Sequence, residues 1–346
     1  MRQAGFISPL FLIGIAGSYA ALAQQCAVTN PVPAVGATIG NPGALALDST
    51  GSVYFTTGNC VLRIDNSGNL SRVAGTSSSG FAGDGAAASS AQLSSPGGLA
   101  TDSAGNLYIA DSGNHRVRQV TPDGNISTVA GTGTGGYAGD GGSAVSAKLN
   151  GPQGLATDRY GNLFIADTNN NVVRKISPSG VITTFAGDGT AGYAYDGYYA
   201  RESQLNLPTG VAVSSGNLFI ADSSNNRIRL VTAAHLITTL AGNGTAGFAG
   251  DGSIGAQDDE AQLNVPTFVA ADTFGLNVYI SDSKNGRVRH VLPYTIITTA
   301  AGGDKTLGMP AGLALDLKGN LFLADSTNSR ILKLSPAGII STIAGK

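Results

Sequence analysis

Charged residues are scarce in this chain, and neither sign dominates. Asp, Glu, Lys and Arg make up 12% of the residues, and 20 basic against 22 acidic side chains give a net charge of -2. Proteins that bind nucleic acid or anionic lipid through surface charge carry a basic excess. We therefore expect neither nucleic acid nor a lipid surface as a partner.

Cysteine is almost absent as well, since Cys26 and Cys60 are the only two. They follow residues 1–23, which have the early Arg, the apolar stretch and the small-x-small end of a secretory signal peptide. The apolar run is short for a membrane span, so we expect cleavage near Ala23 and no span in the mature chain. A secreted or periplasmic location makes the two cysteines a candidate disulfide, with two separate free thiols as the alternative.

Glycine is abundant, with 50 copies, and the chain repeats itself. Six copies of a strand-turn-strand kernel lie roughly fifty residues apart, beginning at Pro42, Pro96, Pro152, Pro208, Pro266 and Pro310. Each copy holds four apolar segments separated by turn residues, which is typical of antiparallel strands. The pattern predicts an all-β fold, a six-bladed β-propeller of four-stranded antiparallel blades over residues 42–346. A lead segment, residues 24–41, precedes the first copy, and its residues 27–41 are expected either to add an outer strand or to lie across the seam.

The motifs within the copies are those of a known family. They combine a Pro-x-Gly-[Leu/Val]-Ala opening, an Asp-x-x-Gly-Asn turn, an Ile-Ala-Asp-Ser strand end, an Asn-x-Arg segment and an Ile-[Ser/Thr]-Thr-x-Ala-Gly strand. In these motifs the chain resembles NHL-repeat propellers, especially the NHL region of teneurins and bacterial secreted NHL-repeat proteins. The resemblance implies a ring of six blades. The first copy departs from it at Thr57, where the others carry Asp, and at Cys60, which suggests a modified cap or seam.

The motif Asp-Ser-x-Asn-x-Arg recurs in most copies, for example from Asp111 to Arg116 and from Asp222 to Arg227. Its carboxylates could form a ring of cation ligands. A single active site requires asymmetry, however, and this motif repeats. We therefore expect a structural role, in which each Asp accepts turn amide bonds and pairs with its own Arg.

The linkers between blades carry the candidate binding residues. Four of them contain Gly-[Phe/Tyr]-Ala-x-Asp-Gly, and the alternation of strands places them on the face of the turns between strands two and three. Aromatic side chains beside carboxylates suit a peptide or glycan surface, and the third and fourth linkers depart most from the set. The candidates are Tyr137, Asp140, Tyr193, Tyr195, Asp196, Tyr198, Tyr199, Phe248, Asp251, Asp258 and Asp259.

A structural interpretation of the repeated linker residues is the alternative, and we prefer it because they recur. In it, the linker aromatics pack as plugs between blades and the linker carboxylates cap the loop turns. The residues concerned are Phe81, Tyr137, Tyr193 and Phe248, and Asp84, Asp140, Asp196 and Asp251.

Enzymatic residues are few. Some six-bladed relatives are lactonases or amidating lyases with a metal in the central channel, which requires several inner-strand carboxylate, amide or His ligands. This chain has three histidines, His115, His235 and His290, and its two glutamates lie in linkers. We predict no catalytic residue, no metal and no cofactor, and hence a binding module for an extracellular or periplasmic protein or glycan. A hydrolase or lyase with a channel metal is the alternative.

Overall fold

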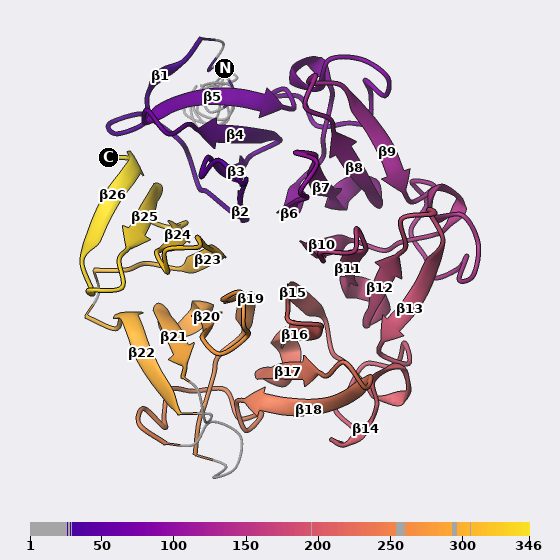
Figure 1. Cartoon of the computed structure of the whole chain (residues 1–346), viewed down its shortest axis with the longest axis vertical. Helices are drawn as coiled ribbons and strands as arrows, with labels where there is room; N and C mark the ends of the chain where they lie inside the picture. Colours follow the sequence, from indigo (N-terminus) through magenta and orange to yellow (C-terminus); the bar gives the residue numbers. More distant parts are fainter. Residues whose placement is uncertain are drawn as a thin grey trace, which may run out of the picture.

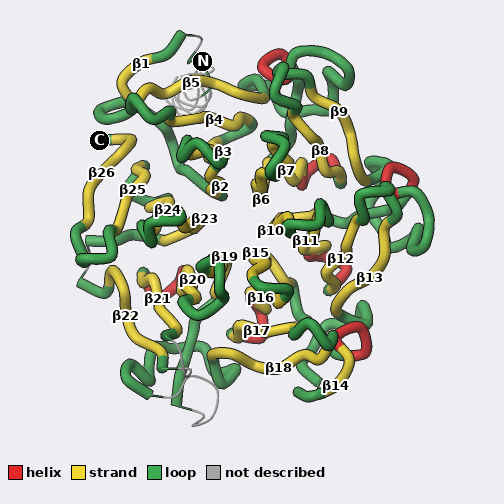
Figure 2. Tube along the Cα trace, viewed as in Figure 1, coloured by secondary structure: helices red, strands yellow, loops and turns green. Residues whose placement is uncertain are grey.

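Six antiparallel sheets surround a central axis in the computed structural model (Figure 1). The structure describes residues 26, 28, 30–194, 196–253, 260–292, 296–304 and 306–346. The inner strands, β2, β6, β10, β15, β19 and β23, face the axis, and β5, β9, β13, β18, β22 and β26 lie toward the rim (Figure 2). The predicted six-bladed β-propeller is therefore confirmed. The predicted signal peptide, residues 1–23, lies outside the described residues.

The sheets follow the order of the copies along the chain. Blade 1 contains β1 (Val32–Pro33), β2 (Leu45–Leu47), β3 (Val53–Thr57), β4 (Cys60–Ile64) and β5 (Asn69–Ala74). Blade 2 contains β6 (Pro96–Thr101), β7 (Leu107–Asp111), β8 (Arg116–Val120) and β9 (Ile126–Ala130). Blade 3 contains β10 (Pro152–Thr157), β11 (Leu163–Asp167), β12 (Val172–Ile176) and β13 (Ile182–Ala186).

The second half of the ring repeats this arrangement. Blade 4 contains β14 (Tyr198–Tyr199), β15 (Pro208–Ser214), β16 (Asn217–Asp222), β17 (Arg227–Val231) and β18 (Leu236–Ala241). Blade 5 contains β19 (Pro266–Ala271), β20 (Val278–Asp282), β21 (Arg287–Val291) and β22 (Ile297–Gly302). Blade 6 contains β23 (Pro310–Leu315), β24 (Leu321–Asp325), β25 (Arg330–Leu334) and β26 (Ile340–Gly345).

Short 3-10 turns are the only helices in the described residues. They are η1 (Ala88–Ser90), η2 (Ser112–Asn114), η3 (Ala144–Ser146), η4 (Thr168–Asn170), η5 (Ala200–Glu202), η6 (Ser223–Asn225) and η7 (Ser283–Asn285). In this part of the chain, no helix has the length and apolarity to cross a membrane.

The apolar core is divided among the interfaces between consecutive blades. One cluster, for example, joins Ala110 and Val117 of blade 2 to Leu155 and Ile165 of blade 3. Strand β11 is buried at all five positions because neighbouring blades cover both of its faces. Each blade therefore depends on its neighbours for burial of its apolar surface.

The inner strands approach one another through small residues. A Cβ atom on Gly154 would lie 2.4 Å from the carbonyl oxygen of Thr209, and one on Gly210 would lie 2.6 Å from that of Thr267. Blade 5 carries Phe268 at the equivalent position, and its side chain packs against the apolar cluster of blades 1 and 2, across the ring. The central channel is thus occupied by an aromatic side chain at this level.

The lead segment closes the ring. Val32 of β1 pairs with Leu70 of β5, which makes β1 the outermost strand of blade 1. The chain then reaches blade 6, where the amide of Gly36 donates to the carbonyl of Gly345 over 2.7 Å and the amide of Gly345 donates to that of Ala34 over 3.1 Å. The two expected roles of the lead segment are therefore both realised.

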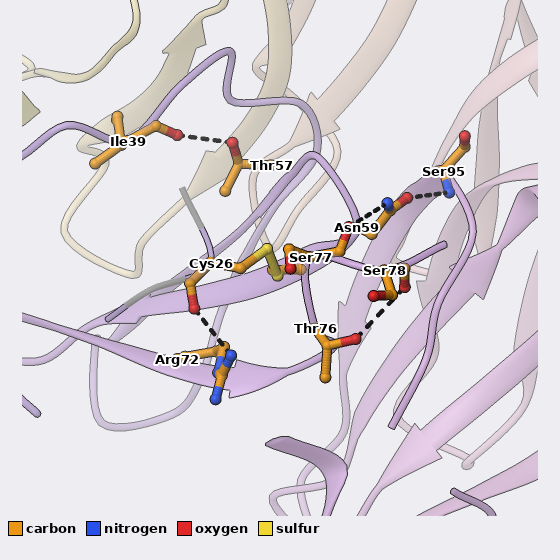
Figure 3. Close-up of a disulfide and its surroundings, with 10 residues drawn as sticks. Cys26, Ile39, Thr57, Asn59, Arg72, Thr76, Ser77, Ser78 and Ser95 are labelled. Carbon is orange, nitrogen blue, oxygen red and sulfur yellow. Dashed lines mark hydrogen bonds between the residues drawn. A yellow bond between two sulfur atoms is a disulfide. The ribbon is translucent and has the colours of Figure 1, made fainter. Parts of the chain in front are cut away.

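The departures in the first copy fasten this lead segment to blade 1. Cys26 and Cys60 form a disulfide, which confirms the pairing and excludes the two free thiols (Figure 3). Arg72 donates to the carbonyl of Cys26 over 2.9 Å, and the Thr57 hydroxyl donates to the carbonyl of Ile39 over 2.7 Å. Thr57 and Cys60 differ from the other copies because they hold the segment that closes the ring.

Candidate binding site at the rim between blades 3 and 4

The strand-end carboxylates form buried ion pairs in blades 2 to 5. In blade 4, Asp222 is fully buried, and its Oδ2 lies 3.4 Å from Nη1 of the fully buried Arg229. Nη2 of the same guanidinium lies 2.8 Å from Oδ1 of the linker residue Asp196. The equivalent groups of three are Arg118 with Asp111 and Asp84, Arg174 with Asp167 and Asp140, and Arg289 with Asp282 and Asp251.

The predicted pairing of each strand-end Asp with the Arg of its own motif is wrong in blades 2, 4 and 5, and in blade 3 Val172 stands in place of the motif arginine. The partner lies two residues further along, and Arg227, for example, instead donates to the carbonyl of Asn243. Blade 6 shows the predicted pair, with Arg330 Nε 2.8 Å from Asp325 Oδ2. There Leu332 occupies the position of the second arginine, so the first one takes the carboxylate.

Burial changes the acidity of these carboxylates. Desolvation raises the pKa of Asp167 and of Asp222 to about 6, although hydrogen bonds and the neighbouring arginine favour the ionised form. Asp316, on a turn between strands one and two, behaves differently. Burial also opposes its ionisation, but hydrogen bonds from Asn320 and the Lys318 amide outweigh that effect and lower its pKa.

We expect the carboxyl groups of Asp167 and Asp222 to titrate near pH 6 in the folded protein. Because their folded pKa lies above the unfolded value of about 3.9, the stability linked to them is fully present below pH about 4. It is lost as the pH rises through about 6. Carbon-detected NMR of the side-chain carboxyls measures the pKa of Asp167 and that of Asp222, with Asp316 as an internal reference. Titration of Asp222 together with Asp316 would contradict the expected shift.

The repeated linker aromatics lie over these arginines. The ring centre of Tyr193 is 3.9 Å from Cζ of Arg227 and 4.8 Å from Cζ of Arg229. Oδ2 of Asp196, its neighbour in the linker, accepts from the Thr239 amide over 2.8 Å. Tyr193 and Asp196 thus attach the linker to the next blade.

The other candidates of this repeated kind contact the equivalent arginines of their next blades. They are Tyr137, Asp140, Phe248 and Asp251. Their aromatics remain partly exposed over the guanidinium groups and do not fill the space between blades. The linker carboxylates bind arginine and strand four; they do not cap loop turns.

The linkers run down the rim and do not stay on one face. The carbonyl of Gly192 accepts from Asn225 in the turn between strands two and three. Further along the linker, β14 pairs with β18 of blade 4, the blade that the linker leads into, and becomes the outermost strand of that sheet. The linker loops and their 3-10 turns η1, η3 and η5 accordingly lie at the periphery between neighbouring blades (Figure 2). The candidate surface is therefore a set of rim grooves.

One of these grooves carries side chains that the equivalent positions lack. It has a volume of about 450 Å³ and lies between the outer strands of blade 3 and the third linker. Tyr199 and Arg201 contribute from the linker, and Tyr199 is 56% exposed. Its neighbour Tyr198 is 57% exposed on the same short strand. The remaining candidates Tyr195, Asp258 and Asp259 lie outside the described residues.

His235 completes the groove, and our sequence analysis did not single it out. It occupies the turn between strands three and four with a left-handed backbone conformation, at a φ of 61°. Blades 1, 2, 3 and 6 have glycine there, namely Gly68, Gly124, Gly180 and Gly338. The ring centre of His235 lies 5.1 Å from that of Phe185 in blade 3. A histidine replacing a turn glycine in one copy was the signal that could have identified it.

The described residues offer little support for the alternative of a metal-dependent enzyme. Within them, no three His, Cys, Asp or Glu side chains lie close enough together to hold a metal ion. Phe268 also extends across the ring. The geometry instead brings aromatic and cationic side chains together at the rim.

Parts of the chain match models of known families. Residues 133–192 match the Teneurin NHL domain, and residues 93–120 and 205–229 match the NHL repeat. Teneurin-4 of Homo sapiens is 30% identical over 223 residues, which covers 56% of this chain and 8% of the length of that protein.

Solved structures share the fold at low sequence identity. An auxiliary nutrient binding protein from Bacteroides ovatus has a TM-score of 0.61 at 12% identity, over 87% of this chain and 69% of that one. A streptogramin B lyase has a TM-score of 0.55 at 12% identity, over 92% of this chain and 86% of that one. At these identities the similarity shows the propeller alone.

Proposed function

The chain is an NHL-repeat β-propeller that resembles the NHL region of teneurins, and we propose that it is a secreted or periplasmic, non-catalytic binding module. Its ligand, a protein or a glycan, occupies the groove between blades 3 and 4. The binding surface is then the rim of the ring at the third linker.

The observation that carries this proposal is the convergence of three departures from the repeat. Tyr199 and Arg201 stand where the first linker has Ala87 and Ser89, and His235 stands where blade 2 has Gly124. All three side chains line one groove, although they come from the linker and from a turn of blade 4. Six similar blades offer six similar surfaces, so selective binding needs such a local difference.

The groove also has the features of a small binding site. Its volume of about 450 Å³ falls in the range of about 300–1,000 Å³ that is typical of ligand pockets. Phe185 forms one wall, and its ring is held by an edge contact of 5.1 Å with Phe164. A rigid aromatic wall beside exposed polar groups provides both contact area and specificity.

We expect the triple variant Tyr199→Ala, Arg201→Ser, His235→Gly to lose the ligand while retaining the fold. Each new residue occurs at the equivalent position of the first linker or blade 2, so the free energy of unfolding should change by less than about 1 kcal/mol. A glycan array and a displayed peptide library, probed with the wild type and the variant, measure binding. A loss of at least about tenfold in affinity is expected for the ligand retained by the wild type.

Val145→Ser is the matched control. Val145 is exposed in the second linker at the position of Arg201, and the first linker has serine there. This control should bind as the wild type does. If every ligand of the wild type is bound equally well by the triple variant, the groove is not the binding site.

A further inference from the structure

We infer that the groove between blades 3 and 4 selects a carbohydrate that carries a carboxylate, that is, a uronate-containing oligosaccharide. This inference rests on the proposed function and names the ligand class of the same site. Three properties of the groove support it: its charge, its aromatic walls and its size.

The groove is lined by cationic groups in a chain that is otherwise poor in charge. Lys175 and Arg201 contribute these groups, and the residues lining it include no Asp or Glu. The side chain of Arg201 is 73% exposed, and its Nε lies 4.0 Å from Glu202, which is a loose surface pair. An incoming carboxylate can therefore replace Glu202 and bind the planar guanidinium through two hydrogen bonds.

Aromatic rings surround these cations. Tyr199 and Phe185 line the groove with the imidazole of His235, whose ring is tilted by 55° against that of Phe185. The apolar C–H face of a pyranose ring can lie against such rings while its substituents reach the polar groups. The Nζ of Lys175 lies 5.9 Å from the ring centre of Phe185, so a cation stands beside the aromatic wall.

The size of the groove favours a sugar over a folded protein. A stable protein interface buries about 800 Å² on each partner, whereas this groove is a discrete hollow of about 450 Å³ between two elements. The exposed hydroxyl of Thr183 adds a donor and acceptor of the kind that binds sugar hydroxyl groups. The combination of cations, aromatic walls and small volume points to an acidic oligosaccharide.

Calorimetric titration of the full chain with uronate tetramers tests this inference. The panel contains galacturonate, mannuronate and guluronate tetramers, the methyl ester of each, and a tetraglutamate peptide. We expect at least one uronate tetramer to bind about tenfold or more tightly than its neutral ester and than the peptide. Failure of all three uronates to bind, or equal binding of acid and ester, would overturn the inference.

Variants separate the charge from the aromatic wall. Arg201→Ser and Lys175→Gln should each weaken uronate binding by about fivefold to tenfold and leave any ester binding unchanged. Tyr199→Ala should weaken acid and ester alike. Arg159→Gln removes an exposed arginine on another turn and should change neither.

The outcomes also distinguish the two proposals. Equal binding of acid and ester, lost in Tyr199→Ala, would overturn the choice of an acidic sugar and leave the groove as the binding site. Preferential binding of tetraglutamate would assign the groove to an acidic peptide and overturn the inference. Binding of a uronate that the triple variant retains would contradict the proposed function itself.

Discussion

Replacement of Arg229 by leucine is expected to lower the free energy of unfolding by about 3–5 kcal/mol. Arg229 and Asp222 are both fully buried, so the substitution leaves a buried carboxylate without its cation. The linker residue Asp196 also loses its partner, but its side chain is 36% exposed and can be hydrated. Urea unfolding at neutral pH, followed by circular dichroism, measures the loss.

The chain itself provides the matched control. Blade 1 has Thr57 and Leu62 where blade 4 has Asp222 and Arg229, so one blade is already built without the pair. The double variant Asp222→Thr, Arg229→Leu should therefore recover most of the stability lost in the single variant. If the single variant is as stable as the double one, the cost does not come from an unpaired buried charge.

Loss of the disulfide is expected to lower the free energy of unfolding by roughly 3–4 kcal/mol, because the bond closes a loop in the unfolded chain. Cys26 and Cys60 are 34 residues apart in sequence. The variant Cys26→Ser, Cys60→Ser should show this loss in urea unfolding. The wild type should lose a similar amount when it is unfolded in the presence of a reductant, whereas the variant should not respond.

A second test asks where in the structure the disulfide variant loses stability. The lead segment joins blades 1 and 6 through the amides of Gly36 and Gly345. Hydrogen exchange in the variant should accelerate at these amides and remain unchanged in β11 of blade 3. A uniform acceleration around the ring would contradict a local role of the bond.

The disulfide also tests the proposed secreted or periplasmic location. An oxidising compartment preserves a disulfide, whereas the cytosol keeps thiols reduced. Because both cysteines are buried, protein recovered from its native host should be denatured without a reductant, and it should then contain no alkylatable thiol. Reactive Cys26 and Cys60 would contradict a secreted or periplasmic location.

Sequence alone determined the fold, the number of blades and the residues that distinguish one copy from another. Strand alternation and turn glycines are local features, so six repeats of them predict six blades without knowledge of long-range contacts. The unusual residues Thr57, Cys60 and Tyr199 were visible because the other copies provide the comparison. The disulfide was expected because only two cysteines follow a predicted signal peptide, although the free-thiol alternative was open.

Only the tertiary structure decided which side chains meet. The sequence predicted that Asp222 pairs with Arg227, whereas in the structure Asp222 pairs with the buried Arg229 and Arg227 donates to the carbonyl of Asn243. Phe268 reaches an apolar cluster on the far side of the ring, which no local pattern encodes. The contact of Phe185 in blade 3 with His235 in blade 4 likewise joins residues far apart in the sequence. Contacts of this kind depend on how whole sheets pack against one another. Repetition specifies each blade, and packing between blades brings three departures from the repeat, Tyr199, Arg201 and His235, together in one groove.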